Sequence, residues 1–158
     1  MIREATAADV PAIHTLIREL ADYEKLLHEV KATEAQLHTA LFGPTPAAFA
    51  LIAEDDTTGE SVGYAIYFLS FSTWEGVHGV YLEDLYVRPG ARGAGHGKAL
   101  LKHLAEICTT RGYARLQWAV LDWNSPSIAF YDSLGAIHEK EWLGYRLTGK
   151  ALTTLANS

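Results

Sequence analysis

The stretch RGAGHGK, residues 92–98, alternates three glycines between an arginine and a lysine. Glycine costs roughly 1 kcal/mol relative to alanine inside a helix, so three glycines ahead of a helical segment indicate that something approaches the backbone closely. A glycine turn between a strand and a helix presents free N–H groups and the positive end of the helix dipole, which together bind anions. The stretch therefore predicts an anion site, with phosphate as the expected anion.

Two common phosphate-binding loops do not fit these residues. The Walker pattern GxxxxGK[ST] requires a glycine where Arg92 stands and a serine or threonine where Ala99 stands. The dinucleotide pattern GxGxxG requires a glycine in place of Lys98. Nucleotide hydrolysis and dinucleotide binding are therefore disfavoured. The alternative that the glycines only permit close packing of a helix on a sheet explains one glycine better than three.

Two adjacent acids, Glu83 and Asp84, occur in the middle of the strand-like run VYLEDLYV, residues 80–87. Buried unpaired carboxylates are costly, so acids inside a central strand indicate a specific role. Side chains alternate across a strand, so only one of the two faces a given side unless a bulge intervenes. The alternative is that the strand is solvated here and both acids are exposed.

The spacing of apolar residues predicts the elements that position these groups. Helices are predicted at residues 10–20, 33–43, from behind the glycines to about 110, and 125–134, and strands at residues 2–5, 49–54, 61–71, 80–87, 115–121 and around 145–147. Strands 80–87 and 115–121 are separated by a crossover helix, which predicts that they lie parallel. The predicted fold class is α/β with a mixed sheet of six or seven strands.

Composition limits the classes of function. A chain of 158 residues without a low-complexity run is expected to form a single domain, residues 1–158. The net charge of −6 argues against a nucleic-acid partner, and no apolar run approaches the roughly 18 residues of a membrane span. A lone cysteine, Cys108, agrees with a reducing, cytoplasmic location. No metal site is expected, because neither HExxH nor CxxC spacing occurs.

The stretch RGAGHG directly after a strand resembles the RxxGxG pyrophosphate loop of the GNAT superfamily of N-acetyltransferases. The similarity extends, from residue 2 to about residue 136, over the segments IREATAADV, LIRELADYEKL, STWEG, YLEDLYV and LDWNSPSIAFYDSLGA. These segments resemble the spermidine/spermine acetyltransferase subgroup, and its thialysine branch in particular. The resemblance implies a single GNAT domain whose sheet splays between its fourth and fifth strands, with acetyl-CoA in the cleft.

The resemblance and the anion-site argument together imply which residues bind the cofactor. Backbone N–H groups between Arg92 and Lys98 would hold the pyrophosphate, and those of the LYV run would stabilise the oxyanion. The implied cofactor contacts are Leu85, Tyr86, Val87, Arg92, Gly93, Ala94, Gly95, His96, Gly97, Lys98, Asn124, Ser127 and Tyr131.

The resemblance also implies the catalytic and substrate-binding residues. Tyr131 matches the tyrosine that protonates the coenzyme A sulfur, a task that suits a phenol; its alternative role is that of a packed aromatic residue. Glu83 is the predicted substrate-contacting acid, with Asp84 as the second candidate. The predicted substrate-binding residues are Tyr23, Glu24, Glu83, Asp84, Gln117 and Trp118.

The expected reaction is direct acetyl transfer, in a ternary complex, to the primary amine of a small molecule. Trp142 and Leu143 stand where polyamine-acetylating relatives carry acids, and Leu134 stands where they often carry arginine. The substrate class is therefore thialysine, a lysine-like amine or a short diamine or polyamine. The resemblance also implies a homodimer, because relatives of this kind are homodimers. The alternatives are a protein or peptide amine acetyltransferase and a non-catalytic acyl-CoA-binding sensor.

Overall fold

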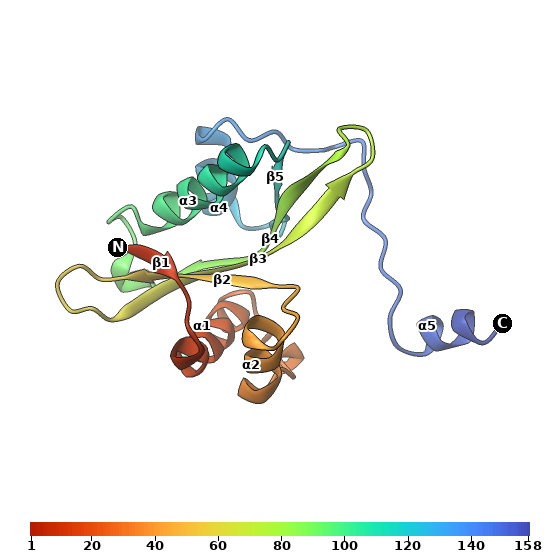
Figure 1. Cartoon of the computed structure of the whole chain (residues 1–158), viewed down its shortest axis with the longest axis horizontal. Coiled ribbons are helices and arrows are strands. Elements are labelled where there is room, and N and C mark those ends of the chain that lie inside the picture. The colour runs from red at the N-terminus through yellow and green to blue at the C-terminus, as the bar shows by residue number, and fades with distance from the viewer. The chain divides into compact units, whose positions relative to one another are not determined.

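The computed structural model describes residues 1–158, which form two compact units, residues 1–119 and residues 120–158 (Figure 1). A five-stranded mixed sheet is the centre of the first unit. Its strands follow one another in space as they do in the chain: β1 Ile2–Glu4, β2 Phe49–Glu54, β3 Ser61–Ser72, β4 Val77–Val87 and β5 Leu116–Gln117. The predicted α/β class with a mixed sheet is confirmed, whereas the prediction of six or seven strands is wrong.

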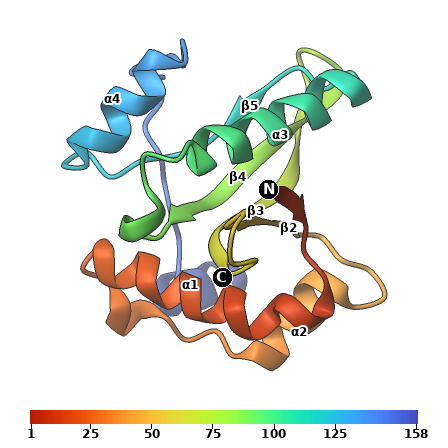
Figure 2. The same cartoon turned by 90° about the vertical axis from the view of Figure 1, so that its left-hand side faces the viewer.

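Helices cover both faces of this sheet. Helices α1 (Val10–Tyr23) and α2 (Glu34–Phe42) lie on one side and α3 (His96–Arg111) lies on the other (Figure 2). The predicted start of α2 is confirmed, because Thr33 caps the helix and forms a capping box with Gln36. None of the helices combines the length and the apolar character that a membrane span requires.

Two sets of buried side chains hold the sheet between these helices. On the α1 face they are Ile13, Leu16, Leu41, Ala50, Ile52, Tyr64, Ile66 and Tyr86. From α3 the buried side chains are Leu100, Leu101, Leu104 and Cys108, whose spacing of three and four residues agrees with the helix predicted behind the glycines. Each large apolar side chain contributes about 1.5–3 kcal/mol when it is buried. The central strands are therefore a firm support for polar groups at their ends.

The two parallel strands meet over a short distance only. Val80 pairs with Leu116 and Tyr81 pairs with Gln117, and β4 then continues to Val87 without a strand partner on this side. The predicted parallel pairing is confirmed, but the predicted strand 115–121 is too long. Strand propensity cannot by itself keep residues 118–121 on the ladder, because pairing depends on the tertiary path of the chain.

The second unit contains two helices and no strand. Helix α4 (Ser125–Ser133) agrees with the helix predicted at residues 125–134, whereas α5 (Gly149–Ala156) was not predicted. The strand predicted around residues 145–147 is wrong, because these residues pair with no other part of the chain. An extended segment becomes a strand only when a neighbour satisfies its N–H and C=O groups.

Candidate active site

The predicted anion loop connects the end of β4 to the start of α3. Gly93 and Gly95 have φ values of 85° and 86°, in the left-handed region that glycine adopts without strain. A Cβ at either position would meet no other atom within 4 Å. These two glycines therefore serve the backbone conformation and leave an open surface, rather than permitting close packing of helix on sheet.

The third glycine has a different place. Gly97 lies inside the first turn of α3, so the expectation that all three glycines precede the helix is wrong for this one. The N–H groups of residues 93–98 have no acceptor within the protein, and Ala99 is the first to donate, to the carbonyl oxygen of Gly95 at 2.9 Å. Unpaired N–H groups at a helix start, with no side chains over two of the glycines, fit a phosphate or diphosphate.

Arg92, at the start of the loop, lies against the strand end and α1. Its Nε donates to the carbonyl oxygen of Val87 at 2.9 Å. Its guanidinium carbon lies 5.1 Å from the ring centroid of Tyr23 and 5.8 Å from that of Tyr86. Such cation–π contacts are worth about 0.5–1 kcal/mol each at exposed sites. Arg92 thus connects the anion loop with α1, where the predicted substrate-binding residues begin.

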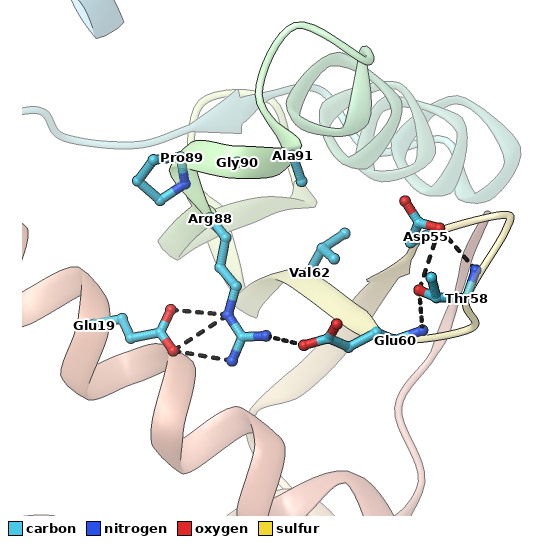
Figure 3. A pocket seen from close by; sticks show the side chains of 9 residues that line it. All are labelled: Glu19, Asp55, Thr58, Glu60, Val62, Arg88, Pro89, Gly90 and Ala91. Atoms are coloured by element: carbon cyan, nitrogen blue, oxygen red, sulfur yellow. Dashed lines mark hydrogen bonds and ion pairs between the residues drawn. The ribbon is translucent and has the colours of Figure 1, made fainter.

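Arg88 fixes the entry to the loop between two acids. Its Nε and Nη2 donate to the carboxylate of Glu19 on α1 at 2.9–3.2 Å, and its Nη1 donates to Glu60 at 2.6 Å (Figure 3). Bidentate pairing of this kind fixes orientation as well as position. The Glu19 hydrogen bonds raise the pKa of Arg88 further above its usual value. The end of β4 is therefore held to α1 and to the start of β3.

A cavity of about 540 Å³ lies beside this ion pair. Its lining residues are Glu19, Asp55, Thr58, Glu60, Val62, Arg88, Pro89, Gly90 and Ala91 (Figure 3). Asp55 accepts hydrogen bonds from the N–H groups of Thr57 and Thr58, and these bonds lower the pKa of its carboxyl. Residues 93–97 of the glycine loop do not line the cavity, and neither does Asp84. We therefore do not assign it to the anion site or to the acid pair.

The acid pair in β4 lies at a β-bulge. Tyr67 of β3 pairs with Leu82, but the next β3 residue, Ile66, pairs with Asp84, so Glu83 is the extra residue. A bulge inserts one residue into one strand and changes the face to which the following side chains point. Asp84 therefore shares the face of Ile66, which is the face that α1 covers, and Glu83 is exposed.

Asp84 is half-buried and accepts a hydrogen bond from a tyrosine. The hydroxyl of Tyr64 donates to Oδ2 of Asp84 at 2.9 Å. Burial raises the pKa of Asp84, the Tyr64 hydrogen bond opposes this shift, and the charge of Glu83 adds to it. A carboxylate with a raised pKa accepts a proton more readily than an ordinary aspartate, which suits a general base.

Glu24, directly after α1, is coupled to this site. Burial raises the pKa of Glu24, and the negative charge of Asp84 raises it further. The structure thus brings together three predicted residues, Tyr23, Glu24 and Asp84, with Arg92 of the anion loop against Tyr23. Two acids whose charges act on each other form a favourable site for a cationic amine.

The open edge of β4 carries the predicted oxyanion donors. The N–H of Arg88 donates to β3 at 2.8 Å. Because successive residues of a strand direct their N–H groups to opposite edges, Leu85 and Val87 direct theirs to the edge that lacks a strand partner, and Tyr86 directs its N–H toward β3. Leu85 and Val87 are therefore the two of the three predicted residues whose N–H groups are placed to bind an oxyanion.

The other predicted site residues lie on β5, just beyond it, and on α4 or at its start. Gln117 and Trp118 are half-buried, Gln117 at the end of β5 and Trp118 just beyond it. In the second unit the Asn124 side chain caps α4 by accepting from the N–H of Ser127 at 3.4 Å. Tyr131 lies on the same helix, half-buried, with its ring 5.5 Å from that of Phe130. The roles assigned to these residues stay predictions.

Comparison with known proteins gives the family. A family model for the acetyltransferase (GNAT) family matches residues 12–136. The chain belongs to this family. It is therefore an N-acetyltransferase, and the predicted resemblance is confirmed.

Relatives of this GNAT protein are similar to it in sequence over almost its whole length. Thialysine N-epsilon-acetyltransferase of Bos taurus is 44% identical, covering 99% of this chain and 96% of the relative. L-ornithine N5-acetyltransferase of Arabidopsis thaliana is 31% identical, covering 98% of this chain and 86% of the relative. Among solved structures, an integron cassette protein from V. cholerae has a TM-score of 0.82 at 29% identity, covering 100% of this chain and 98% of that one.

Sequence analysis missed two residues of this GNAT site, Tyr64 and Arg88. Neither belongs to a recognisable motif. A weak signal existed for Tyr64, because a tyrosine inside a buried strand requires a partner for its hydroxyl. No comparable signal pointed to Arg88, whose partners lie 69 residues away on α1 and 28 residues away at the start of β3.

The loop conformation predicts a difference between two of its glycines. Gly95→Ala forces a Cβ into a left-handed backbone and should lower the free energy of unfolding by about 1–2 kcal/mol. Gly97→Ala is the matched control, since Gly97 is helical and its Cβ would have only an ordinary contact, 4.0 Å from Val87. We expect the control to be neutral or to gain up to about 1 kcal/mol. Urea unfolding measures both, and equal losses would contradict the assigned backbone roles.

Proposed function

We propose that this chain is an acetyl-CoA-dependent N-acetyltransferase that acetylates the primary amine of a small molecule by direct attack in a ternary complex. The observation that carries the proposal is that two partly buried carboxylates, Asp84 and Glu24, both have raised pKa values and act on each other, while Tyr23, next to Glu24, packs against Arg92 of the anion loop. Such a pair attracts an ammonium group and accepts its proton.

The proposed substrate class is thialysine, a lysine-like amine or a short diamine or polyamine. The relatives named for thialysine and for L-ornithine act on compact amino acids that carry a side-chain amine. The apolar residues Trp142 and Leu143 in the EWLGYRL segment and Leu134 favour a compact amine over a long polycation. A change of one or two pocket groups alters preference by about 1–3 kcal/mol, so the class is proposed and not a single compound.

Acetyl-CoA is the proposed donor, and it supplies the acetyl group as a thioester. The N–H groups of residues 93–98 would bind its diphosphate, with Lys98 adding charge. The N–H groups of Leu85 and Val87 would stabilise the oxyanion at the open edge of β4. Asn124 and Ser127 are proposed contacts of the pantetheine arm, and Tyr131 is the proposed acid for the departing thiolate.

Asp84 and Glu24 would serve the activation of the amine, which must lose a proton before it attacks. An alkylamine of pKa about 10.4 is unprotonated in only about one molecule in 2,500 at pH 7, a cost of about 4.6 kcal/mol. Sequence analysis placed Glu83 first as the acid that contacts the amine. The bulge favours Asp84 instead, since Asp84 faces the buried side with Tyr64 while Glu83 is exposed.

We also propose that residues 1–158 form one N-acetyltransferase domain that works in the cytoplasm. In support of one domain, the family match at residues 12–136 crosses the border between the two compact units. In support of a reducing compartment, Cys108 is a buried free thiol.

The proposed function predicts turnover with compact amines. A thiol-release assay with acetyl-CoA should show faster acetylation of thialysine, lysine, ornithine or a short diamine than of lysine-containing peptides. Tyr131→Phe should retain coenzyme A affinity and lose about a hundredfold or more in kcat, with Tyr113→Phe as a control of equal chemistry. Faster peptide turnover would favour a protein acetyltransferase. Coenzyme A binding without turnover of any amine would favour a sensor.

Substitution of the two acids of β4, Asp84 and Glu83, should change the pH profile of kcat/KM to different extents. Asp84→Asn should displace the rise of kcat/KM to higher pH, because the amine must then lose its proton without that carboxylate. Glu83→Gln should displace it less, because Glu83 is exposed. The profiles of kcat/KM against pH for both variants and the wild type test this order. A larger displacement in Glu83→Gln would restore Glu83 as the acid.

A homodimer is the proposed assembly. Its support is the set of exposed apolar side chains in the second unit, Ile137, Trp142, Leu143 and Tyr145, since such side chains often mark interfaces. Light scattering should give a mass about twice that of the 17.3 kDa chain. Serine at both Leu143 and Tyr145 should shift the mass toward that of one chain. A wild-type monomer at micromolar concentration would contradict the proposal.

A further inference from the structure

Tyr64 lies outside the sequence segments on which the family resemblance rests. It lies in β3, is fully buried, and belongs to the same buried cluster as Ile13 and Leu16 of α1. Its hydroxyl donates a hydrogen bond to Oδ2 of Asp84 at 2.9 Å. A buried hydroxyl in this setting requires a partner, and the partner it has is the acid of the proposed active site.

We propose that Tyr64 is a positioning residue for acetyl transfer: its hydroxyl holds one oxygen of Asp84, so that the carboxylate is kept ionised and its other oxygen is directed to the amine. This inference rests on the proposed function, because it assigns to Asp84 the contact with the amine. Tyr64 itself contacts neither amine nor donor in this assignment and acts through Asp84.

The strand register explains why this pair forms. Tyr64 pairs with Tyr86 and Ile66 pairs with Asp84, so all four side chains lie on one face and Tyr64 is diagonal to Asp84. Diagonal neighbours on a sheet lie within reach of an aromatic side chain. Without the bulge, the regular register would place Glu83 opposite Ile66. The bulge therefore selects which of the two acids meets the tyrosine.

The charged and titratable groups around Asp84 give the hydroxyl its effect. Burial and the charge of Glu83 both raise the pKa of Asp84, and the hydrogen bond from Tyr64 lowers it. Directly after α1, the negative charge of Glu24 interacts with both Asp84 and Tyr64. Beyond these, Arg92 lies over Tyr86 at 5.8 Å. Among the groups that act directly on Asp84, Tyr64 is thus the one that favours the charged form.

Tyr64 is suited to this task because it stays protonated. Burial, together with the charge of Asp84, raises the pKa of Tyr64 far above its usual value. The hydroxyl therefore remains a donor throughout the pH range in which an acetyltransferase works. A donor that never loses its proton lets Asp84 titrate alone, which makes the pair simple to test.

The test removes the hydroxyl and keeps the ring. Tyr64→Phe deletes the hydrogen bond to Asp84, and Tyr67→Phe is the matched control in the same strand. Tyr67 is also buried, but its ring lies 5.4 Å from that of Phe49, and no hydrogen bond joins it to Asp84. Unfolding in urea establishes that both variants fold.

Two measurements are made on each variant. Carbon-13 NMR follows the carboxyl of Asp84 against pH, with the signal assigned by its absence in Asp84→Asn. Loss of the hydrogen bond should raise the pKa of Asp84 by about one unit in Tyr64→Phe and leave it unchanged in Tyr67→Phe. The profile of kcat/KM for the amine should rise at a pH about one unit higher in Tyr64→Phe. Below this rise the variant should be about tenfold slower, while kcat/KM at high pH changes less.

The outcomes separate this inference from the proposed function. An Asp84 titration that does not change in Tyr64→Phe overturns the inference whether or not the protein is active. A shifted titration with an unshifted kcat/KM profile also overturns it, because Asp84 then does not act on the amine. Absence of turnover with every amine in the wild type overturns the proposed function, and with it the assignment of Tyr64 to catalysis, even when the NMR titration shifts.

Discussion

The β-bulge at Glu83 is the constraint on which the proposed amine site of this protein depends. One extra residue in β4 changes the face of every following side chain, and so places Asp84 among buried residues under α1. The same change determines which N–H groups of β4 meet the open edge of the sheet. A regular strand would have presented Glu83 to the buried face, and would have turned a different set of N–H groups outward.

The half-buried carboxylate of Asp84 is tolerated because a hydrogen bond offsets part of the cost of its burial. An unpaired buried acid would cost several kcal/mol, but Asp84 has a hydrogen bond from Tyr64 and keeps a raised pKa. Structural stability and reactivity are therefore linked here, since the feature that makes the acid costly also makes it a better proton acceptor. Glu24 adds a second negative charge, which favours the binding of a cationic ligand.

The proposed acetyl-CoA site is formed mainly by backbone N–H groups and not by side chains. Left-handed glycines at 93 and 95 and the unpaired N–H groups that follow them form an open surface at the start of α3. Arg88 holds the entry of this loop to α1 and β3, and Arg92 packs against Tyr23 near the acids. Both arginines connect the loop region to α1. The same contacts would therefore position the proposed cofactor loop and the proposed amine site relative to each other.

The sequence by itself determined the local features: helices α1 to α4, strands β2 and β3, and the glycine loop. These follow from periodicity and spacing along the chain, which a sequence displays directly. The sequence also contains the motifs on which the family resemblance rests. Only the tertiary structure decided which of Glu83 and Asp84 is buried, that Tyr64 bonds to Asp84, that Arg88 pairs with α1, and that residues 145–147 form no strand. The physical reason is the same in each case. A bulge, a diagonal contact and a strand pairing each depend on a partner distant in the chain, and a residue's own type does not name that partner.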